Sequence, residues 1–256
     1  TPDSFSDGGK WTQPAQIETQ VRKLVGQGAS VIDVGAESTR PGAGAIDLDT
    51  EISRLTNVFP LLQNLKRELN FKLSLDTRNA QTAKEILSKF EVDWLNDVQG
   101  FEEPGMFQVA KNFHGRIAVM HSISVPPEPK RIIDPNKSLT EWLHHWALKK
   151  IHALTQKGIE LERLIIDPGI GFGKSLSQNF EIVHRYQEWA KLPCDILVGH
   201  SRKRFLDPHG NIATNDRDFE SACMSYELAQ HGIEFLRVHE VELHRRALQL
   251  SAFSAG

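Results

Sequence analysis

Acidic and amide residues stand at the ends of several short apolar runs, where they could recognise a polar ligand. They are Asp33, Asp76, Asn96, Asp97 and Asp167. A carboxylate accepts two parallel hydrogen bonds, so this set suits a flat heterocycle that carries N–H and NH2 donors. Any one of them could instead cap a helix, because Asp and Asn are common N-cap residues. Their recurrence at successive run ends favours one shared binding site.

Basic residues supply a second set of groups at comparable places in the chain. They are Arg40, Lys203, Arg204, Arg237 and His239. Cationic side chains bind phosphate oxygens or a carboxylate, so the two sets together predict a substrate with a hydrogen-bonding ring and an anionic tail. The run 201–204 could also be a solvated basic face, as charge runs usually are. Because it directly follows an apolar run, at least one of its side chains should point into the site.

Gly169, Gly171 and Gly173 precede Lys174 in a segment that superficially resembles a nucleotide-binding loop. A Walker A motif needs glycine where this chain has Pro168, and the GxGxxG fingerprint needs a closing glycine that this segment lacks. We therefore predict no nucleotide site here. We expect a flexible loop whose glycines let the backbone approach a ligand.

The elements that would position these groups alternate strictly between strand and helix. Such alternation predicts parallel strands with right-handed crossovers, which an open doubly wound sheet and a closed barrel both satisfy. The count favours an α/β fold of the (β/α)8 TIM-barrel type, with its first strand missing or truncated before residue 1 and a single domain over 1–256. In a barrel all C-terminal strand ends open on one face, where the polar residues would gather. The predicted strands are 30–35, 72–76, 93–96, 115–121, 164–167, 195–199 and 234–239.

Composition limits the kinds of function open to the protein. The 256 residues carry a net charge of −3, so no global basic character argues for nucleic acid. Cys194 and Cys223 show neither CxxC nor Cys/His ligand spacing, which argues against a disulfide framework and a structural zinc site and fits two reduced, buried thiols. No apolar run approaches the ~18 residues of a membrane span. We expect a cytoplasmic protein.

Taken together, several segments resemble the motifs of the dihydropteroate synthase family and run in that family's order. They are TPDSFSDGG (1–9), IDVGAESTRPG (32–42), LDT (75–77), LNDV (95–98), DPGIGFGK (167–174), GHSRK (199–203) and RVHEV (237–241). The resemblance covers essentially the whole chain. It implies that (7,8-dihydropterin-6-yl)methyl diphosphate and 4-aminobenzoate give 7,8-dihydropteroate and diphosphate, with Mg2+ on the diphosphate. It also implies that sulfonamides, which mimic 4-aminobenzoate, inhibit the enzyme.

The resemblance assigns roles to individual residues by their position in the motifs. The pterin ring would contact Asp33, Asp76, Asn96, Met120, Asp167 and Lys203. The diphosphate would be held by Thr39, Arg40, Arg237 and His239. The 4-aminobenzoate pocket would be shaped by Phe5, Asp7, Arg40, Pro41, Phe172, Ser201 and Lys203. The catalytic residues among these would be Asp76, Asp167, Lys203, Arg237 and His239, and no residue of this sequence is assigned to the metal.

Departures from the family pattern keep two other functions in view. The family's metal-contacting Asn would lie before Thr1, Ala36 replaces a common glycine, and residues 122–126 replace the usual segment after Met120 and His121. One alternative is a methyltransferase of the same fold that uses methyltetrahydrofolate, although it would need no diphosphate grip. The other is a non-catalytic pterin-binding paralogue. The resemblance further implies a homodimer and, as in some members, a fused pyrophosphokinase domain upstream.

Overall fold

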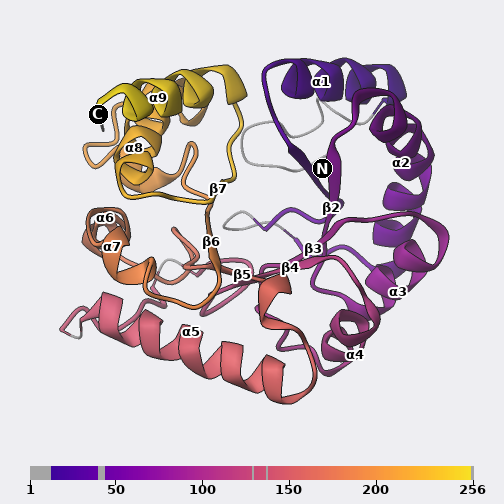
Figure 1. Cartoon of the computed structure of the whole chain (residues 1–256), viewed down its shortest axis with the longest axis horizontal. Helices are drawn as coiled ribbons and strands as arrows, with labels where there is room; N and C mark the ends of the chain where they lie inside the picture. Colours follow the sequence, from indigo (N-terminus) through magenta and orange to yellow (C-terminus); the bar gives the residue numbers. More distant parts are fainter. Residues whose placement is uncertain (1–12, 40–43, 129, 137, 255–256) are drawn as a thin grey trace.

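The computed structural model describes residues 13–39, 44–128, 130–136 and 138–254. Strands and helices alternate along this part of the chain (Figure 1). The strands are β1 Val31–Gly35, β2 Lys72–Asp76, β3 Trp94–Asp97, β4 Arg116–Met120, β5 Leu164–Asp167, β6 Asp195–Val198 and β7 Phe235–Leu236. The helices are α1 Pro14–Gly26, α2 Leu48–Leu69, α3 Ala80–Lys89, α4 Pro104–Asn112, α5 Leu139–Gln156, α6 Leu176–His184, α7 Tyr186–Trp189, α8 Asp218–Gln230 and α9 Val241–Ser254. Short 3-10 turns are η1 Leu161–Arg163, η2 Arg204–Leu206 and η3 Thr214–Asp216.

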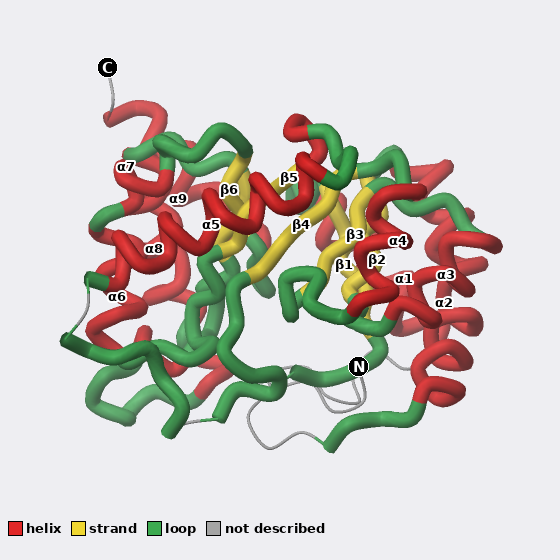
Figure 2. Tube along the Cα trace, turned by 90° about the horizontal axis from the view of Figure 1, so that it is seen from below, coloured by secondary structure: helices red, strands yellow, loops and turns green. Residues whose placement is uncertain are grey.

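These strands form one parallel sheet in the order β1-β2-β3-β4-β5-β6-β7. Figure 2 shows strands of this sheet in yellow with the helices in red around them. A strand is present at each of the predicted positions, which confirms the α/β class and the parallel arrangement. The last strand is shorter than the predicted 234–239, although Arg237 still donates its backbone N–H to the Val198 carbonyl at 3.1 Å. Asp76 is in register with Asn96, and Met120 with Asp167, so polar strand ends lie along one edge of the sheet.

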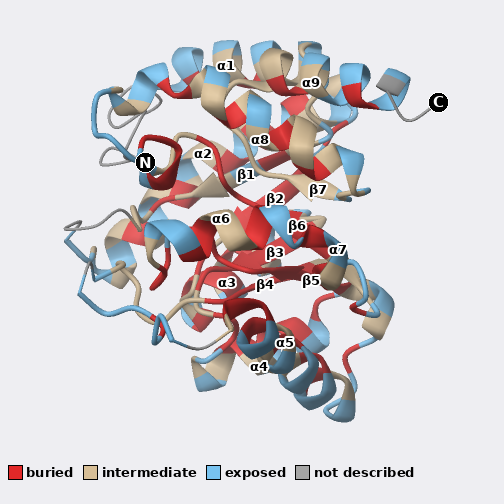
Figure 3. Cartoon of the chain, turned by 90° about the vertical axis from the view of Figure 1, so that its left-hand side faces the viewer, coloured by how far each residue is buried: buried red, intermediate tan, exposed pale blue. Residues whose placement is uncertain are grey.

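Two apolar layers cover the two faces of this sheet. The inner layer contains Trp94, Ala118, Ile165 and Leu197, with Phe235 packed against them. Trp94 and Phe235 meet edge to face with ring centroids 4.8 Å apart, although β3 and β7 are not neighbours in the sheet. The sheet therefore curls until its inner face meets itself. The helices lie outside it, with buried strands at the centre and exposed helix faces at the surface (Figure 3).

Local sequence signals fix where the loops of the predicted site end. Asp47 caps α2 by accepting the Thr50 backbone N–H at 2.8 Å. Ser175 and Gln178 form a capping box at the start of α6, the Ser-x-x-Gln pattern typical of helix N-termini. The loop after β1 and the glycine-rich loop after β5 therefore each run into a firmly capped helix.

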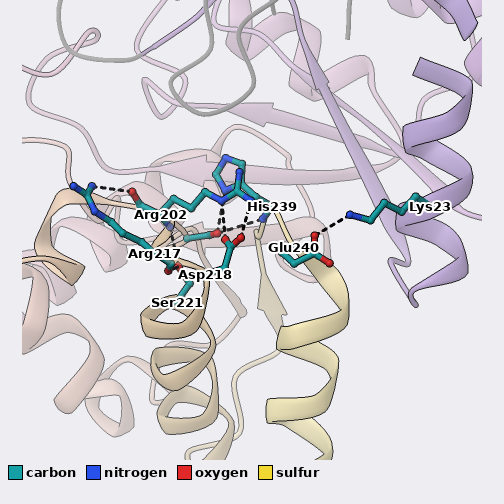
Figure 4. A network of polar contacts seen from close by, with 8 residues as sticks. Lys23, Arg202, Arg217, Asp218, Ser221, His239 and Glu240 are labelled. Atoms are coloured by element: carbon teal, nitrogen blue, oxygen red, sulfur yellow. Dashed lines mark hydrogen bonds and ion pairs between the residues drawn. The ribbon is translucent and has the colours of Figure 1, made fainter. Parts of the chain in front are cut away.

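Helices α1 and α9 lie next to each other although they adjoin opposite edges of the sheet (Figures 1 and 3). Glu240, just before α9, accepts a hydrogen bond from Lys23 Nζ of α1 at 2.9 Å (Figure 4). It also accepts one from Gln27 Nε2, just after α1, at 3.0 Å. Within the described residues, β1 and β7 each pair with a strand on one side only. The helical layer thus bridges the two edge strands. The predicted eighth strand is not among the strands described.

Both cysteines are free, as expected, but only one of them is shielded. Cys194 is half-buried, whereas Cys223 on α8 is exposed, so the expectation of two buried thiols was wrong for Cys223. None of the described helices combines the length and the apolar character needed to cross a membrane.

Candidate active site

Four predicted residues meet at the sheet edge where the strands end. Arg237 Nη1 donates to Asp33 Oδ2 at 3.2 Å and to Asp76 Oδ2 at 3.4 Å. Asn96 Nδ2 donates to the same Asp33 oxygen at 3.2 Å. The four residues come from β1, β2, β3 and the segment after β7, and parallel strands place their carboxyl ends on one face. The structure brings these residues together, while their roles in binding stay predictions.

Burial and neighbouring charges set the protonation of this cluster. Burial, and then the negative charge of Asp33, raise the pKa of Asp76, against the opposing effect of Arg237. Burial also raises the pKa of Asp167, while Arg237 and the Gly169 backbone N–H lower it. For Arg237 itself, burial lowers the pKa, but Asp33 and Asp76 outweigh it and raise the pKa above the ordinary arginine value. Arg237 therefore stays charged and offsets the cost of placing carboxylates in a partly buried site.

Lys203 is the member of the basic run that faces this cluster. Its Nζ donates to the carbonyl of Ile170 and lies 4.4 Å from the centroid of the Phe172 ring. Burial and the charge of Arg237 lower the pKa of Lys203 to about 7, although Asp167 raises it. The expectation that one side chain of the run points into the site holds for Lys203.

The neighbouring arginines of the run point elsewhere. Arg202 donates to both carboxylate oxygens of Asp218, at 2.7 and 2.8 Å (Figure 4). Arg204 is exposed and donates to the carbonyl of Asp207, which closes its own turn. Including Arg204 in the binding cluster was therefore wrong. The run divides its three cations between one site residue and two structural contacts.

Replacing Lys203 with methionine should change how stability depends on pH. A lysine whose folded-state pKa lies near 7 resists protonation in the folded protein, whereas the unfolded chain protonates near 10.4. The resulting loss of folding stability is complete below pH 7 and disappears as the pH rises through the pKa of the lysine in the unfolded chain. Urea unfolding between pH 7 and 10 should therefore show the free energy of unfolding of wild type rising relative to that of Lys203→Met. The rise should be up to about 1.4 kcal/mol per pH unit. A difference independent of pH would show that the lysine is ordinarily basic.

The glycine-rich loop is held from inside by Lys174. The buried Lys174 Nζ donates to the carbonyls of Gly169 and Phe172, both at 2.9 Å, and lies 2.8 Å from His121 Nδ1. Burial lowers the pKa of His121 to about 2, so its ring is neutral and Nδ1 can accept from the amine. The loop is thus a bonded turn and not the flexible segment expected. Sequence reasoning treated Lys174 only as part of a rejected phosphate motif and missed this role.

Gly169 is required by both its backbone conformation and its surroundings. Its φ is +69°, and a Cβ there would lie 1.9 Å from the His121 carbonyl oxygen. Gly169→Ala should therefore lower the free energy of unfolding by more than about 3 kcal/mol, because the loop and β4 must separate. Gly158 is the matched control, since its φ is +93° but nothing lies within 4 Å of a built Cβ. Gly158→Ala should cost only about 1–2 kcal/mol in urea unfolding. Equal losses in the two variants would contradict the close approach.

Other predicted residues line the same region. Ser201 is buried, and its Oγ lies 3.0 Å from His239 Nδ1 and accepts the His239 backbone N–H at 3.3 Å. Met120 and Phe172 are buried together with Val98 in a small apolar cluster. These contacts supply an apolar surface and a fixed histidine beside the charged cluster.

Some of the predicted site residues lie outside the described part of the chain, and one described residue does not join the cluster. Phe5, Asp7, Arg40 and Pro41 lie outside the residues that the structure describes, whereas Thr39 is described and half-buried. Asp97 does not join the charged cluster, because its carboxylate accepts the backbone N–H groups two and four residues later, at 2.7 and 2.9 Å. Asp97 therefore closes the turn after β3 and caps no helix, because α4 begins only at Pro104 with Glu103 as its N-cap residue.

Sequence reasoning also missed a buried carboxylate behind the site. Glu51 on α2 is 1% exposed and accepts hydrogen bonds from Thr77, Asn79 and Thr82 at 2.6–2.7 Å. The sequence did contain a signal for the burial of Glu51, because this residue occupies the same helical stripe as Leu55 and the other apolar residues of α2. A charged residue on an apolar stripe indicates a buried polar network.

A cavity of about 510 Å3 opens at the other end of the strands. Its lining includes Val31, Lys72, Trp94 and Arg116, most of which begin strands. None of the predicted site residues lines it. In βα barrels this N-terminal face serves stability, so we do not place the chemistry there.

A curled parallel sheet wrapped by helices, with acidic, amide and cationic groups at its carboxyl strand ends, defines a class of protein. That class is the βα-barrel proteins, whose binding sites lie at this end of the strands. Residues 1–239 match the model of the pterin binding enzyme family. The chain is 31% identical over 242 residues to dihydropteroate synthase of Escherichia coli K12, covering 94% of this chain and 84% of that protein. The chain belongs to the pterin-binding enzymes and, among them, to the dihydropteroate synthase family.

Further comparisons agree with this family. The folate synthesis bifunctional protein of Chlamydia caviae is 35% identical over 257 residues, which cover 99% of this chain but only 57% of that protein. A solved dihydropteroate synthase of Yersinia pestis in a sulfonamide drug complex has a TM-score of 0.90 and 28% identity, covering 99% of this chain and 90% of that one. The Anaplasma phagocytophilum dihydropteroate synthase with bound 6-hydroxymethylpterin-monophosphate has a TM-score of 0.87 and 34% identity, covering 94% of each chain.

Proposed function

We propose that this protein joins (7,8-dihydropterin-6-yl)methyl diphosphate to 4-aminobenzoate, giving 7,8-dihydropteroate and diphosphate. The observation that carries the proposal is the bridge from Arg237 to Asp33 and Asp76 at the sheet edge that also presents Asn96. One site thus offers acceptors for a nitrogen-rich ring beside a permanent cation for an anionic tail. The pterin and sulfonamide ligands of the Anaplasma and Yersinia proteins support the same assignment.

The ring would be recognised by oriented acceptors on an apolar surface. Asp167 Oδ1 accepts the Gly169 backbone N–H at 2.7 Å, which fixes the carboxylate so that Oδ2 can accept from the 2-amino and N3 edge. Asn96 and Asp76 would complete the ring contacts. Met120 would pack against the ring face, and Phe172 beside Lys203 would border the 4-aminobenzoate.

The bond changes follow from these charges. Breaking the C–O bond of the pterinylmethyl diphosphate leaves a cation delocalised into the ring. Asp76 and Asp167 stabilise it in their carboxylate forms, and the positive charge beside them lowers the pKa values that burial raises. Arg237 and His239 stabilise the departing diphosphate, and a well-placed group at developing charge contributes about 2.7–4 kcal/mol. The amine of 4-aminobenzoate then forms the C–N bond and releases one proton. No side-chain nucleophile is needed for this sequence.

Mg2+ would be carried by the diphosphate and not by a closed protein site. Among the described residues, no group of three or more His, Cys, Asp or Glu side chains is placed to hold a metal ion. Mg2+ commonly keeps several waters and binds mainly through substrate phosphates, which is the arrangement proposed here. When bound, it would neutralise charge on the leaving group. The family's asparagine ligand would come from residues before Thr1.

We propose that an eighth strand completes the barrel between β1 and β7, in one domain with residues 1–256. Its support is that these two strands pair on one side only within the described residues, while Glu240 holds the adjoining helices together. Such a strand would precede Thr1 and would carry the asparagine to the carboxyl end. Amide protection of β1 and β7 in the full-length protein tests this, and unprotected edge amides would contradict it.

We further propose a cytoplasmic homodimer. Strongly exposed apolar side chains stand on α8 and α9, where Phe219, Leu250 and Phe253 are 72%, 63% and 87% exposed, and a subunit contact would cover such groups. The two free cysteines fit a reducing compartment. Light scattering that gives a monomer mass at micromolar concentration would oppose the dimer.

The reaction is tested by measuring diphosphate release from the full-length protein. Release should occur only when 4-aminobenzoate is supplied, and a sulfonamide should suppress it. No release, with 6-hydroxymethylpterin still binding by calorimetry, would instead identify a non-catalytic paralogue. Methyl transfer from methyltetrahydrofolate without diphosphate release would identify the methyltransferase.

A further inference from the structure

The loop after β1 is tied to the loop after β2 by a two-point ion pair. Arg78 donates to Glu37 through Nε at 2.8 Å and through Nη2 at 2.9 Å. The Glu37 and Arg78 side chains are only 9% and 19% exposed, and Glu37 raises the pKa of Arg78. A planar guanidinium that meets a carboxylate at two points fixes orientation as well as distance. Glu37 stands two residues before Thr39, the proposed diphosphate contact.

Arg78 is itself held in place by the residues on either side of it. Thr77 Oγ1 donates to Glu51 Oε1 at 2.7 Å, and Asn79 Nδ2 donates to Glu51 Oε2 at 2.6 Å. Glu51 belongs to α2 and is 1% exposed, so it acts as a rigid anchor. The backbone that carries Arg78 is therefore bound on both sides before its guanidinium reaches Glu37.

The same helix also holds the β1 loop directly. Arg54, one turn along α2 from Glu51, donates through Nη1 to the carbonyl of Ala36 at 3.0 Å. Two successive residues of the loop, Ala36 and Glu37, are thus fixed, one by its backbone and the other by its side chain. Thr39 follows Glu37 after one intervening residue, so the fixed pair sets where the chain enters this part of the loop.

We propose that Glu37 and Arg78 are positioning residues that set the loop carrying Thr39 for the substrate's diphosphate. This rests on the proposed function, since the loop's ligand is the diphosphate of the pterin substrate. Neither residue needs to touch the substrate, because they act through the loop backbone. Binding of the pterin ring depends instead on Asp76, Asn96 and Asp167, whose side chains bond to Arg237, Asp33 and the Gly169 backbone and not to this ion pair. Breaking the pair should therefore weaken binding of the diphosphate and leave ring binding unchanged.

The test compares two ligands by calorimetry in the full-length protein. For Arg78→Met, the Kd of the pterin diphosphate substrate should rise tenfold or more, while the Kd of 6-hydroxymethylpterin, which lacks phosphate, should stay within twofold of wild type. Arg78→Lys should lie between the two, because it keeps the charge but loses the two-point contact. The exchange Glu37→Arg with Arg78→Glu should recover most of the loss. In steady-state assays the KM for the diphosphate substrate should change more than kcat.

A matched control separates positioning from general stability. Arg22 makes a similar two-point contact with Glu68, at 2.6 and 2.8 Å, between α1 and α2 on the exposed surface. Arg22→Met should change neither Kd. Equal weakening of both ligands in Arg78→Met, or no change in either, would overturn the proposal. If Arg78→Met fails to fold, Glu37→Gln and Arg78→Lys decide by the same comparison. Failure of wild type to bind either ligand would instead overturn the proposed function.

Discussion

Arg237→Ala should raise the Kd of the pterin diphosphate substrate at least about a hundredfold and leave 4-aminobenzoate binding to the enzyme–diphosphate complex nearly unchanged. Arg237 is the cation shared by Asp33 and Asp76, at 3.2 and 3.4 Å. In the proposed function Arg237 makes two charge-assisted contacts to the diphosphate, and its removal would take away both, each contributing about 1.5–3 kcal/mol. It also leaves Asp33 and Asp76 without their shared cation, so the negative charge that they keep repels the diphosphate.

The loss of Arg237 should also be visible without substrate. The pKa of Asp76 is already raised by burial and by Asp33, and Arg237 is the group that opposes this rise. In Arg237→Ala the pKa of Asp76 should therefore move further upward, which carboxyl NMR titration would detect. Arg237→Lys retains the charge and should show a smaller shift and a smaller loss of affinity. Equal weakening of diphosphate and 4-aminobenzoate binding would show that Arg237 is misplaced in the proposed mechanism.

Asp167→Asn should lower kcat/KM by about a thousandfold while preserving the fold. The asparagine carbonyl can still accept the Gly169 backbone N–H that Asp167 accepts at 2.7 Å. Its amide group would then face the 2-amino and N3 donors of the ring, so donor meets donor where two charge-assisted hydrogen bonds were made. Two such bonds contribute roughly 3–6 kcal/mol, which corresponds to a factor of about a thousand. The negative charge that stabilises the ring cation is lost as well.

Calorimetry with 6-hydroxymethylpterin isolates the ring contact of Asp167 from the diphosphate. Binding should weaken strongly in Asp167→Asn, whereas in Arg237→Ala it should change little. The control is Asn136→Asp, which makes the reverse change, from amide to carboxylate, at an exposed position. It reveals effects of protein preparation that are unrelated to the site. Wild-type kcat/KM in Asp167→Asn would remove Asp167 from the proposed site.

The order of strands and helices was readable from the sequence because periodicity is local. Apolar runs such as 72–76 and 164–167 became β2 and β5 at the predicted residues. The convergence of strand-end residues could also be anticipated, since parallel strands with helical crossovers must place their carboxyl ends on one face. No other information was needed to place Asp33, Asp76, Asn96 and Arg237 in one group.

The sequence did not predict in which direction an individual side chain points or which group it bonds to. Nothing in the run 201–204 distinguishes Lys203, which faces the site, from Arg202, which binds Asp218 on α8. Asp97 and Asp76 look alike at strand ends, yet one caps its own turn and the other meets Arg237. These outcomes depend on partners that lie far away in sequence.

By itself, the sequence determined the class of fold, the face that carries the polar groups and the family of the chain, because each follows from local period, short motifs or their order. Tertiary structure alone decided which groups pair: Glu37 with Arg78, Glu51 with Thr77. Tertiary structure likewise decided that Lys174 bonds its loop from within. The reason is that a hydrogen bond requires two atoms about 3 Å apart, and the chain specifies that distance only once the sheet has curled and its loops have met.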